Sequence, residues 1–115
     1  MGKDRLERVD SLLRRVIAEG VFRIMQGSGV PPASITITGV ECGKDLRDAT
    51  VRVSVFGEES LKRRAIRELS RNARKFQQEI NAQVKLKFTP RLAFRLDRSI
   101  EQGDRVLSIL EKLEI

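Results

Sequence analysis

The stretch from Leu61 to Ile80, LKRRAIRELSRNARKFQQEI, combines an apolar helical stripe with most of the surplus charge of the chain. Its apolar residues recur every three or four positions, which predicts a helix with one buried face. They are Leu61, Ala65, Leu69, Ala73, Phe76 and Ile80. The remaining faces carry the charge, so this helix joins the predicted core to a predicted functional surface.

Seven basic residues lie between positions 62 and 75 against the single acid Glu68, an excess of +6 in a protein of net charge +7. These candidate phosphate-binding residues, the positions at which RNA binding would be expected if the partner is a nucleic acid, are Lys62, Arg63, Arg64, Arg67, Arg71, Arg74 and Lys75. In a continuous helix, Arg63 to Arg74 would span about 16 Å, a length that suits a run of phosphates. The alternative is a solvated helix face without a ligand.

The composition indicates a folded domain whose partner is an anion. A chain of 115 residues that is 40% hydrophobic and 34% charged predicts one domain, residues 1–115, with its own core. A positive field favours nucleic acid or an acidic membrane surface. Because no apolar run reaches the length of a membrane span and no signal peptide is evident, we expect a cytoplasmic protein.

Enzymatic chemistry is not predicted. The sequence has no histidine, only one cysteine, Cys42, and no phosphate-binding glycine motif, so we expect no catalysis, metal, cofactor or small-molecule substrate. The acids Glu58 and Glu59 are interpreted as partners of a helix dipole, with Gly57 as the N-cap. Cys42 is interpreted as a packing residue or an exposed thiol without chemistry.

Around the central helix, the patterns predict a helix at Asp4–Met25, a loop at 26–32, and a hairpin of strands Ser34–Glu41 and Leu46–Phe56. An alternating segment, Val84–Leu96, predicts a third strand that Pro90 interrupts as a bulge, a break or an edge. The polar alternate positions of the hairpin predict that all helices cover one face of a mixed sheet.

A last helix is predicted after Ser99 from the apolar residues Val106, Leu107, Leu110 and Leu113. The order helix, strand, strand, interrupted helix, strand, helix is a type II KH-like α+β arrangement with an added C-terminal helix. From helix propensity, an interruption or restart of the central helix is predicted near Ser70 to Asn72, because asparagine is a poor helix former in a helix interior and a good N-cap.

The phenylalanines give little indication of base recognition. Phe76, Phe88 and Phe94 lie in phase with the apolar positions, so all three are predicted to belong to the core rather than to stack on bases. RNA bases are commonly read by aromatic stacking. Binding by the central helix is therefore expected to be mainly electrostatic, with contacts to the RNA backbone.

Two segments carry a resemblance to the bacterial ribosome-binding factor A family. They are SITITGVECGKDLRDATVRVSVFG, Ser34 to Gly57, and LKFTPRLAFRLDRSIEQGDRVLSIL, Leu86 to Leu110. The second is the more specific, because it combines a P-x-L-x-F strand with an aspartate, a serine and a glycine. With the first helix included, the resemblance covers nearly the whole chain.

This resemblance implies an assembly factor that binds the immature 30S subunit and 16S ribosomal RNA near its 5′ end. Apart from the resemblance, we expect a monomer. It also implies a part in precursor rRNA processing and in growth in the cold. In the family, an Ala-x-Gly kink replaces the usual KH loop and aligns with Asn72-Ala73-Arg74 here. This chain has Arg74 in place of that glycine and Gln77 where an arginine is common.

Two other classes of function remain open. A generic nucleic-acid-binding module would bind any polyanion, DNA included, without preferring immature subunits. A protein interaction domain would use the polar sheet face or the last helix, with the basic residues incidental.

Overall fold

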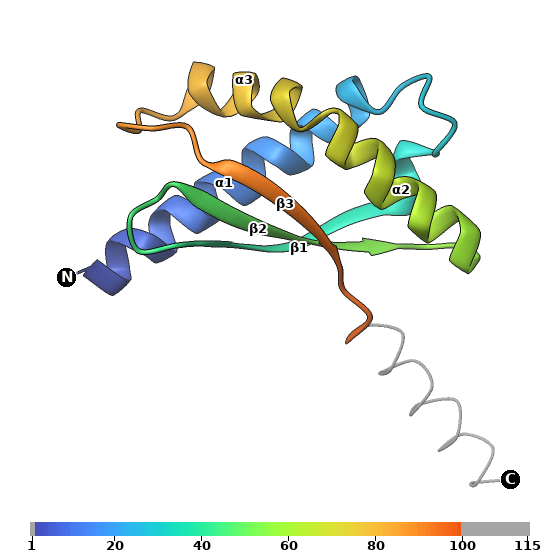
Figure 1. Cartoon of the computed structure of the whole chain (residues 1–115), viewed down its shortest axis with the longest axis horizontal. Coiled ribbons are helices and arrows are strands. Elements are labelled where there is room, and N and C mark those ends of the chain that lie inside the picture. Colours follow the sequence, from blue (N-terminus) through green and yellow to red (C-terminus); the bar gives the residue numbers. More distant parts are fainter. Residues whose placement is uncertain (1, 100–115) are drawn as a thin grey trace, which may run out of the picture.

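The computed structural model describes residues 2–99 as helices packed on a small sheet (Figure 1). The chain forms α1 (Gly2–Ile24), a 3₁₀ turn η1 (Pro32–Ser34), β1 (Ile35–Cys42), β2 (Asp48–Val55), α2 (Glu59–Arg71), α3 (Ala73–Gln83) and β3 (Arg91–Leu96). The helix predicted after Ser99 lies outside the described residues.

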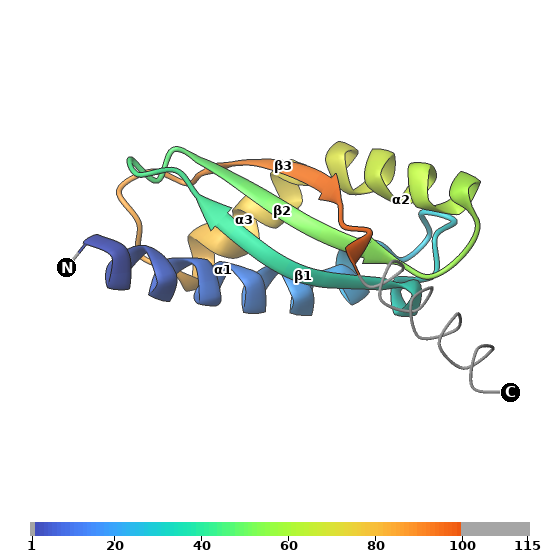
Figure 2. The same cartoon turned by 90° about the horizontal axis from the view of Figure 1, so that it is seen from below.

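The sheet has the strand order β1-β2-β3 (Figure 2). β1 and β2 form the predicted antiparallel hairpin, and β3 pairs with β2 in parallel, so the sheet is mixed. In β2 the alternate residues Ala49, Val51, Val53 and Val55 are at most 3% exposed. The helices cover this apolar face, which confirms the predicted α+β architecture.

A bulge in β1 determines which residues of this strand reach the core. Ile37 pairs with Val53 and Gly39 with Arg52, so Thr38 is an extra residue on one side of the ladder. Strict alternation from Ile35 would have placed Gly39 toward the helices. The bulge instead buries Val40 and leaves Glu41 exposed.

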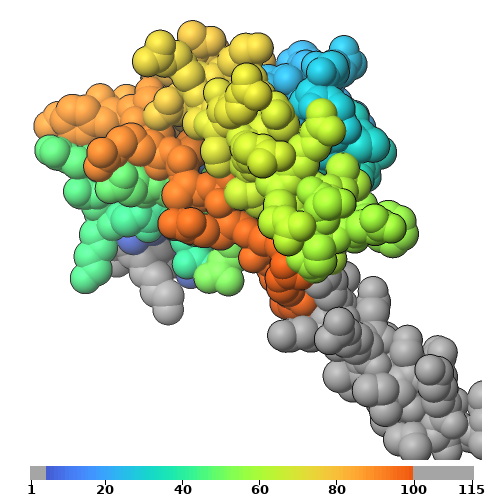
Figure 3. Space-filling model, turned by 45° about the vertical axis from the view of Figure 1, so that its right-hand side comes forward, coloured from blue at the N-terminus to red at the C-terminus, as the bar shows by residue number. Residues whose placement is uncertain are grey.

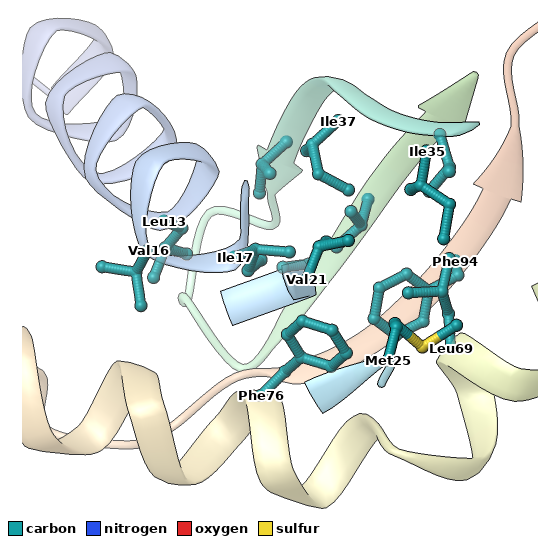
Figure 4. Packing of buried hydrophobic residues seen from close by; sticks show 14 of the residues in the cluster. Leu13, Val16, Ile17, Val21, Met25, Ile35, Ile37, Leu69, Phe76 and Phe94 are labelled. Carbon is teal, nitrogen blue, oxygen red and sulfur yellow. The ribbon is translucent and has the colours of Figure 1, made fainter. Parts of the chain in front are cut away.

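The core lies between α1, α3 and the sheet (Figure 4). The stripe predicted for the first helix is largely buried, with Leu13 and Ile17 fully buried. Phe76 of α3 and Phe94 of β3 have ring centroids 5.6 Å apart at a tilt of 56°. A Cβ on Gly20 would lie 3.5 Å from the Phe76 ring, so α1 and α3 are in van der Waals contact at this position.

The predicted third strand is wrong in its first half. β3 begins only at Arg91, and residues 84–90 form an irregular segment. Pro90 is fully buried and has no N–H for a ladder, and its carbonyl accepts a hydrogen bond of 3.0 Å from the Gln77 amide. Pro90 therefore acts as the break that was one of the predicted alternatives.

The break changes the interpretation of one phenylalanine. Phe76 and Phe94 are buried as predicted, but Phe88 is 46% exposed, so its predicted place in the core is wrong. The period-two pattern that placed Phe88 with the core residues does not apply, because its segment is not a strand.

The central helix is also interrupted. α2 ends at Arg71, α3 begins at Ala73, and the two helices meet at an angle at Asn72 (Figure 1). The interruption predicted at Asn72, Ala73 and Arg74 is therefore present. A straight ridge from Arg63 to Arg74 is not, because the two arginines belong to different helices.

Candidate nucleic-acid interface

Six of the seven predicted RNA-binding residues are exposed. They belong to α2 and α3, whose surface is seen in Figure 3. Together they define the basic face: Arg63, Arg64, Arg67, Arg71, Arg74 and Lys75. The structure thus brings the predicted charges to one region, although from two helices.

Lys62 differs from the other six. Its side chain is only 11% exposed, and its Nζ lies 3.8 Å from Glu59 Oε1. It lies three residues before the buried Ala65 and seven before the buried Leu69, so helical spacing turns it toward the core side of α2. Lys62 therefore supports the helix and is not part of the basic face.

The junction at Asn72 needs no glycine. Asn72 has φ −98° and ψ 12°, a conformation that residues with a side chain can adopt. Its side-chain amide donates to the Glu68 carbonyl at 2.8 Å and so caps the end of α2 rather than the start of α3. Arg74 can accordingly stand where relatives are expected to have glycine.

The positive potential of the junction comes from side chains. The N-terminus of α3 carries a partial positive charge, but the C-terminus of α2, with its partial negative charge, meets it at Asn72. The first turn of α3 contains no acid, and Arg74 and Lys75 lie in it.

A small hollow adjoins the junction. It has a volume of about 270 Å³ and is lined in part by Arg71, Asn72 and Lys75, with the loop after α1 opposite. Arg71 is held by Glu68, with 3.3 Å between Nη1 and Oε1. No hydrogen bond or ion pair joins the side chain of Arg67, Arg74 or Lys75 to a partner within residues 2–99. These three cations can therefore bind phosphate without giving up a contact to another residue of the described part of the chain.

Arg64 is oriented by the loop after α1. Its Nη2 donates to the Ser28 carbonyl at 3.3 Å, and its guanidinium lies over Gly29. Gly29 has φ +85°, a conformation that disfavours other residues, and a Cβ there would collide with Arg64. Gly29 thus serves both the turn and the placement of this arginine.

Replacing Gly29 by alanine should lower the free energy of unfolding by about 1–2 kcal/mol from the backbone alone. The loss should be close to that of Gly27→Ala, because Gly27 has a similar φ of +79° and the exposed Arg64 side chain can turn away from a Cβ at Gly29. Urea denaturation of both variants measures the two losses. A loss at Gly29 clearly larger than the loss at Gly27 would show that Arg64 is fixed over this turn.

The sequence did not indicate the contact that fixes the start of α2. Arg98 forms a two-pronged pair with Glu59, with Nη1–Oε1 at 2.6 Å and Nη2–Oε2 at 2.7 Å. The N-cap is Glu58 and not the predicted Gly57, and Glu59 lies in the first turn as expected. Because 39 residues separate Arg98 from Glu59, no local pattern could have revealed this pair.

Hydrogen bonds from Arg98 lower the pKa of Glu59 from 4.5 to about 2, with smaller contributions from nearby Lys62 and Arg63. A lowered pKa means that the pair stabilises the fold fully above pH 4.5 and loses this contribution as the pH falls toward 2. Replacing Arg98 by alanine should return the Glu59 pKa most of the way to 4.5.

Carboxyl carbon NMR shifts against pH measure this pKa directly. Arg95→Ala, which removes another exposed arginine of the same region, should leave it near 2. A Glu59 pKa that stayed near 2 in the Arg98 variant would assign the shift to another group.

The cysteine has no sign of reactivity. Cys42 is half-buried, its backbone N–H donates to Asp10 Oδ1 at 2.9 Å, and burial together with Asp10 raises its thiol pKa to about 12. Such a thiol stays protonated near neutral pH, in agreement with a packing residue.

The described part of the chain lacks two further kinds of site. Residues 2–99 contain no group of three acidic or cysteine side chains placed to hold a metal ion. No helix in that range is both long and apolar enough to cross a membrane.

The α+β fold, with an interrupted helix pair between β2 and β3 and a basic face at the interruption, defines a KH-like domain. A profile of the ribosome-binding factor A family matches residues 5–110. Ribosome-binding factor A of Dictyoglomus thermophilum is 33% identical over 111 residues, 96% of this chain and 92% of the relative. Ribosome-binding factor A of Trichormus variabilis is 33% identical over 110 residues, which are 96% of this chain and 83% of the relative. The chain belongs to the ribosome-binding factor A family.

Solved structures agree with this assignment. The crystal structure of ribosome-binding factor A from Thermus thermophilus matches with a TM-score of 0.70 and 26% identity, over 82% of this chain and 98% of that one. A Thermus thermophilus ribosome-binding factor A homology model, fitted into the cryo-EM map of a 30S complex, matches with a TM-score of 0.61. This homology model is 28% identical in sequence, and the match covers 77% of this chain and 91% of that one.

Proposed function

We propose that this protein is an assembly factor that binds the immature 30S subunit in the cytoplasm. Its ligand is 16S ribosomal RNA near the 5′ end, and its binding assists subunit maturation, precursor rRNA processing and growth in the cold. It acts by binding, without catalysis or cofactor, as a monomer. The observation that carries the proposal is the basic face on a chain of this family.

The contacts of the basic face support an electrostatic mechanism. Arg67, Arg74 and Lys75 are exposed cations without internal partners among the described residues, so binding RNA breaks no ion pair at these positions. The basic face itself contains no aromatic residue, so it contacts phosphates and leaves the bases largely unread. Specificity then depends on the shape of the subunit and on where the two helices place their charges.

Sucrose-gradient co-sedimentation with free 30S, 50S and mature 70S particles tests this function. The protein should sediment with 30S particles, and more with 30S from cells that accumulate immature subunits. Equal distribution over all particles would favour a generic nucleic-acid-binding module. No sedimentation with any particle would contradict ribosome binding altogether.

A further inference from the structure

A second basic region lies at the end of the molecule away from α2 (Figures 1 and 2). It is a groove of about 830 Å³ between the β1–β2 turn, the segment before β3 and the beginning of α1. We call it the hairpin groove. The residues that matter here are Arg5, Lys44, Arg47, Lys85, Lys87 and Phe88.

Phe88 gives this groove a feature that the basic face lacks. Its ring is 46% exposed, the Arg47 guanidinium carbon lies 5.0 Å from the ring centroid, and Lys87 Nζ lies 5.6 Å from it. Within residues 2–99, no other aromatic ring has a cation over its face. The groove therefore presents a flat apolar ring next to positive charge.

The charge of the groove is strongly one-sided. Five basic side chains line it against one carboxylate, Asp45. Both oxygens of that carboxylate already contact Arg47. Oδ1 accepts a hydrogen bond from the Arg47 backbone N–H at 3.1 Å, and Oδ2 lies 3.8 Å from Arg47 Nε. The remaining positive charge faces whatever enters the groove.

The β1–β2 turn is held in a defined shape. Leu46 has φ +60°, uncommon for a residue with a side chain, and its N–H donates to the Gly43 carbonyl at 3.0 Å. The Gly43 N–H in turn donates to the Asp48 carbonyl at 2.9 Å. Lys44 and Arg47 are thus presented by a fixed turn, so little ordering is needed when a ligand binds.

A ligand that matches both features has negative charge and a flat ring. An acidic peptide provides the charge without the ring, and a double helix hides its bases in the stack. An unpaired nucleotide offers a base to stack on Phe88 and phosphates to pair with lysine and arginine. The long exposed side chain of Arg47 or Lys87 can move aside, or the guanidinium can stack on the base itself.

We propose that the hairpin groove binds single-stranded RNA, with Phe88 as the stacking platform and the surrounding cations as phosphate ligands. We choose RNA rather than another polyanion as the ligand because the proposed function is binding of ribosomal RNA, and the inference rests on that proposal. The basic face lies apart from this groove, at the junction of α2 and α3 (Figure 1), so the protein would hold two separate RNA segments at once.

The test compares wild-type protein with Phe88→Ala and Phe88→Leu for binding of fluorescent hexauridylate, measured by anisotropy. Both variants should bind at least about fivefold more weakly, because both lose the aromatic stack while leucine keeps an apolar side chain in the groove. Phe56→Ala removes a ring that is 87% exposed elsewhere on the surface and should bind like the wild type.

Further ligands separate the alternatives. The wild-type protein should bind an abasic hexamer more weakly than it binds hexauridylate. The Phe88 variants should bind the abasic hexamer with nearly the same affinity as the wild-type protein does. The proposal would be overturned by wild-type affinity in both Phe88 variants or by no saturable binding of hexauridylate. Equal binding of the abasic hexamer or of polyglutamate would also overturn it, since neither has a base.

The test of the hairpin groove can fail or succeed independently of the test of 30S binding. Replacing Arg67, Arg71 and Arg74 by alanine should weaken binding to 30S subunits but leave most of the hexauridylate affinity. If the Phe88 variants bind hexauridylate normally while the triple variant loses 30S binding, only the hairpin groove fails. If the triple variant keeps 30S binding while Phe88 is needed for hexauridylate, only the basic face fails.

Discussion

Replacing Phe76 by alanine should lower the free energy of unfolding by about 3–5 kcal/mol, enough to unfold much of the protein. The side chain is fully buried, touches Phe94 across the α3–β3 contact and lies against Gly20 of α1. Its removal leaves a cavity where three elements meet. Urea denaturation followed by circular dichroism measures the loss.

Phe22→Ala is the matched control, because this phenylalanine lies on α1 but is 57% exposed. Its loss should stay within about 0.5 kcal/mol, as is usual for surface substitutions. A Phe76 variant as stable as the Phe22 variant would contradict the described core, and with it the placement of α3 that orients Arg74 and Lys75.

Replacing Arg67, Arg71 and Arg74 together by alanine should weaken binding to 30S subunits by roughly a hundredfold near 0.1 M salt. Each lost phosphate contact removes about 0.7 from the slope of log affinity against log salt, which amounts to about two orders of magnitude for three contacts at that salt. All three residues are exposed, so the fold should persist. Filter binding with purified subunits measures the affinity.

A triple variant of α1, Arg8, Arg15 and Arg23 to alanine, removes the same charge from exposed positions of another helix. It should weaken binding much less, because it removes no residue of the basic face; besides the long-range field, it changes only the ion pair of Arg23 with Glu79 of α3, 3.2 Å long. Equal losses in the two variants would mean that net charge alone determines binding and that the basic face has no special part.

The strongest periodic patterns predicted the fold correctly. The stripe of α2 and α3 and the alternation of β2 follow from burial of one face, so Leu69, Phe76, Ile80 and Val53 are all buried as expected. The helix interruption was also foreseeable at Asn72, since its amide competes for backbone groups. The actual bond, to Glu68 behind it, shows that asparagine ends α2 instead of starting α3.

The remaining features depend on contacts between distant residues. Lys62 faces inward because the buried stripe of α2 includes its position. The charge of its side chain did not predict that it would be buried. Phe88 is exposed because Pro90 ends the ladder and residues 84–90 leave the sheet. The pair of Glu59 with Arg98 requires β3 to end beside the start of α2, which is a property of the tertiary fold.

The sequence identified the segment that carries the basic face but not how its residues are arranged in space. The excess of basic residues around Arg67 and Arg71 is local in sequence, so the sequence alone indicated the helices that carry the basic face. The hairpin groove was not predicted, because Arg5, Arg47 and Phe88 come from three separate segments whose charges are unremarkable individually.

The salt dependence of 30S binding tests the central claim most directly, because it counts ionic contacts with the basic face. We expect the slope of log affinity against log salt to be smaller by about 2 in the triple variant of Arg67, Arg71 and Arg74 than in the wild-type protein. The α1 triple variant should keep nearly the wild-type slope. Identical slopes for all three proteins would contradict the account, because the exposed arginines of α2 and α3 would then not be the surface that binds RNA.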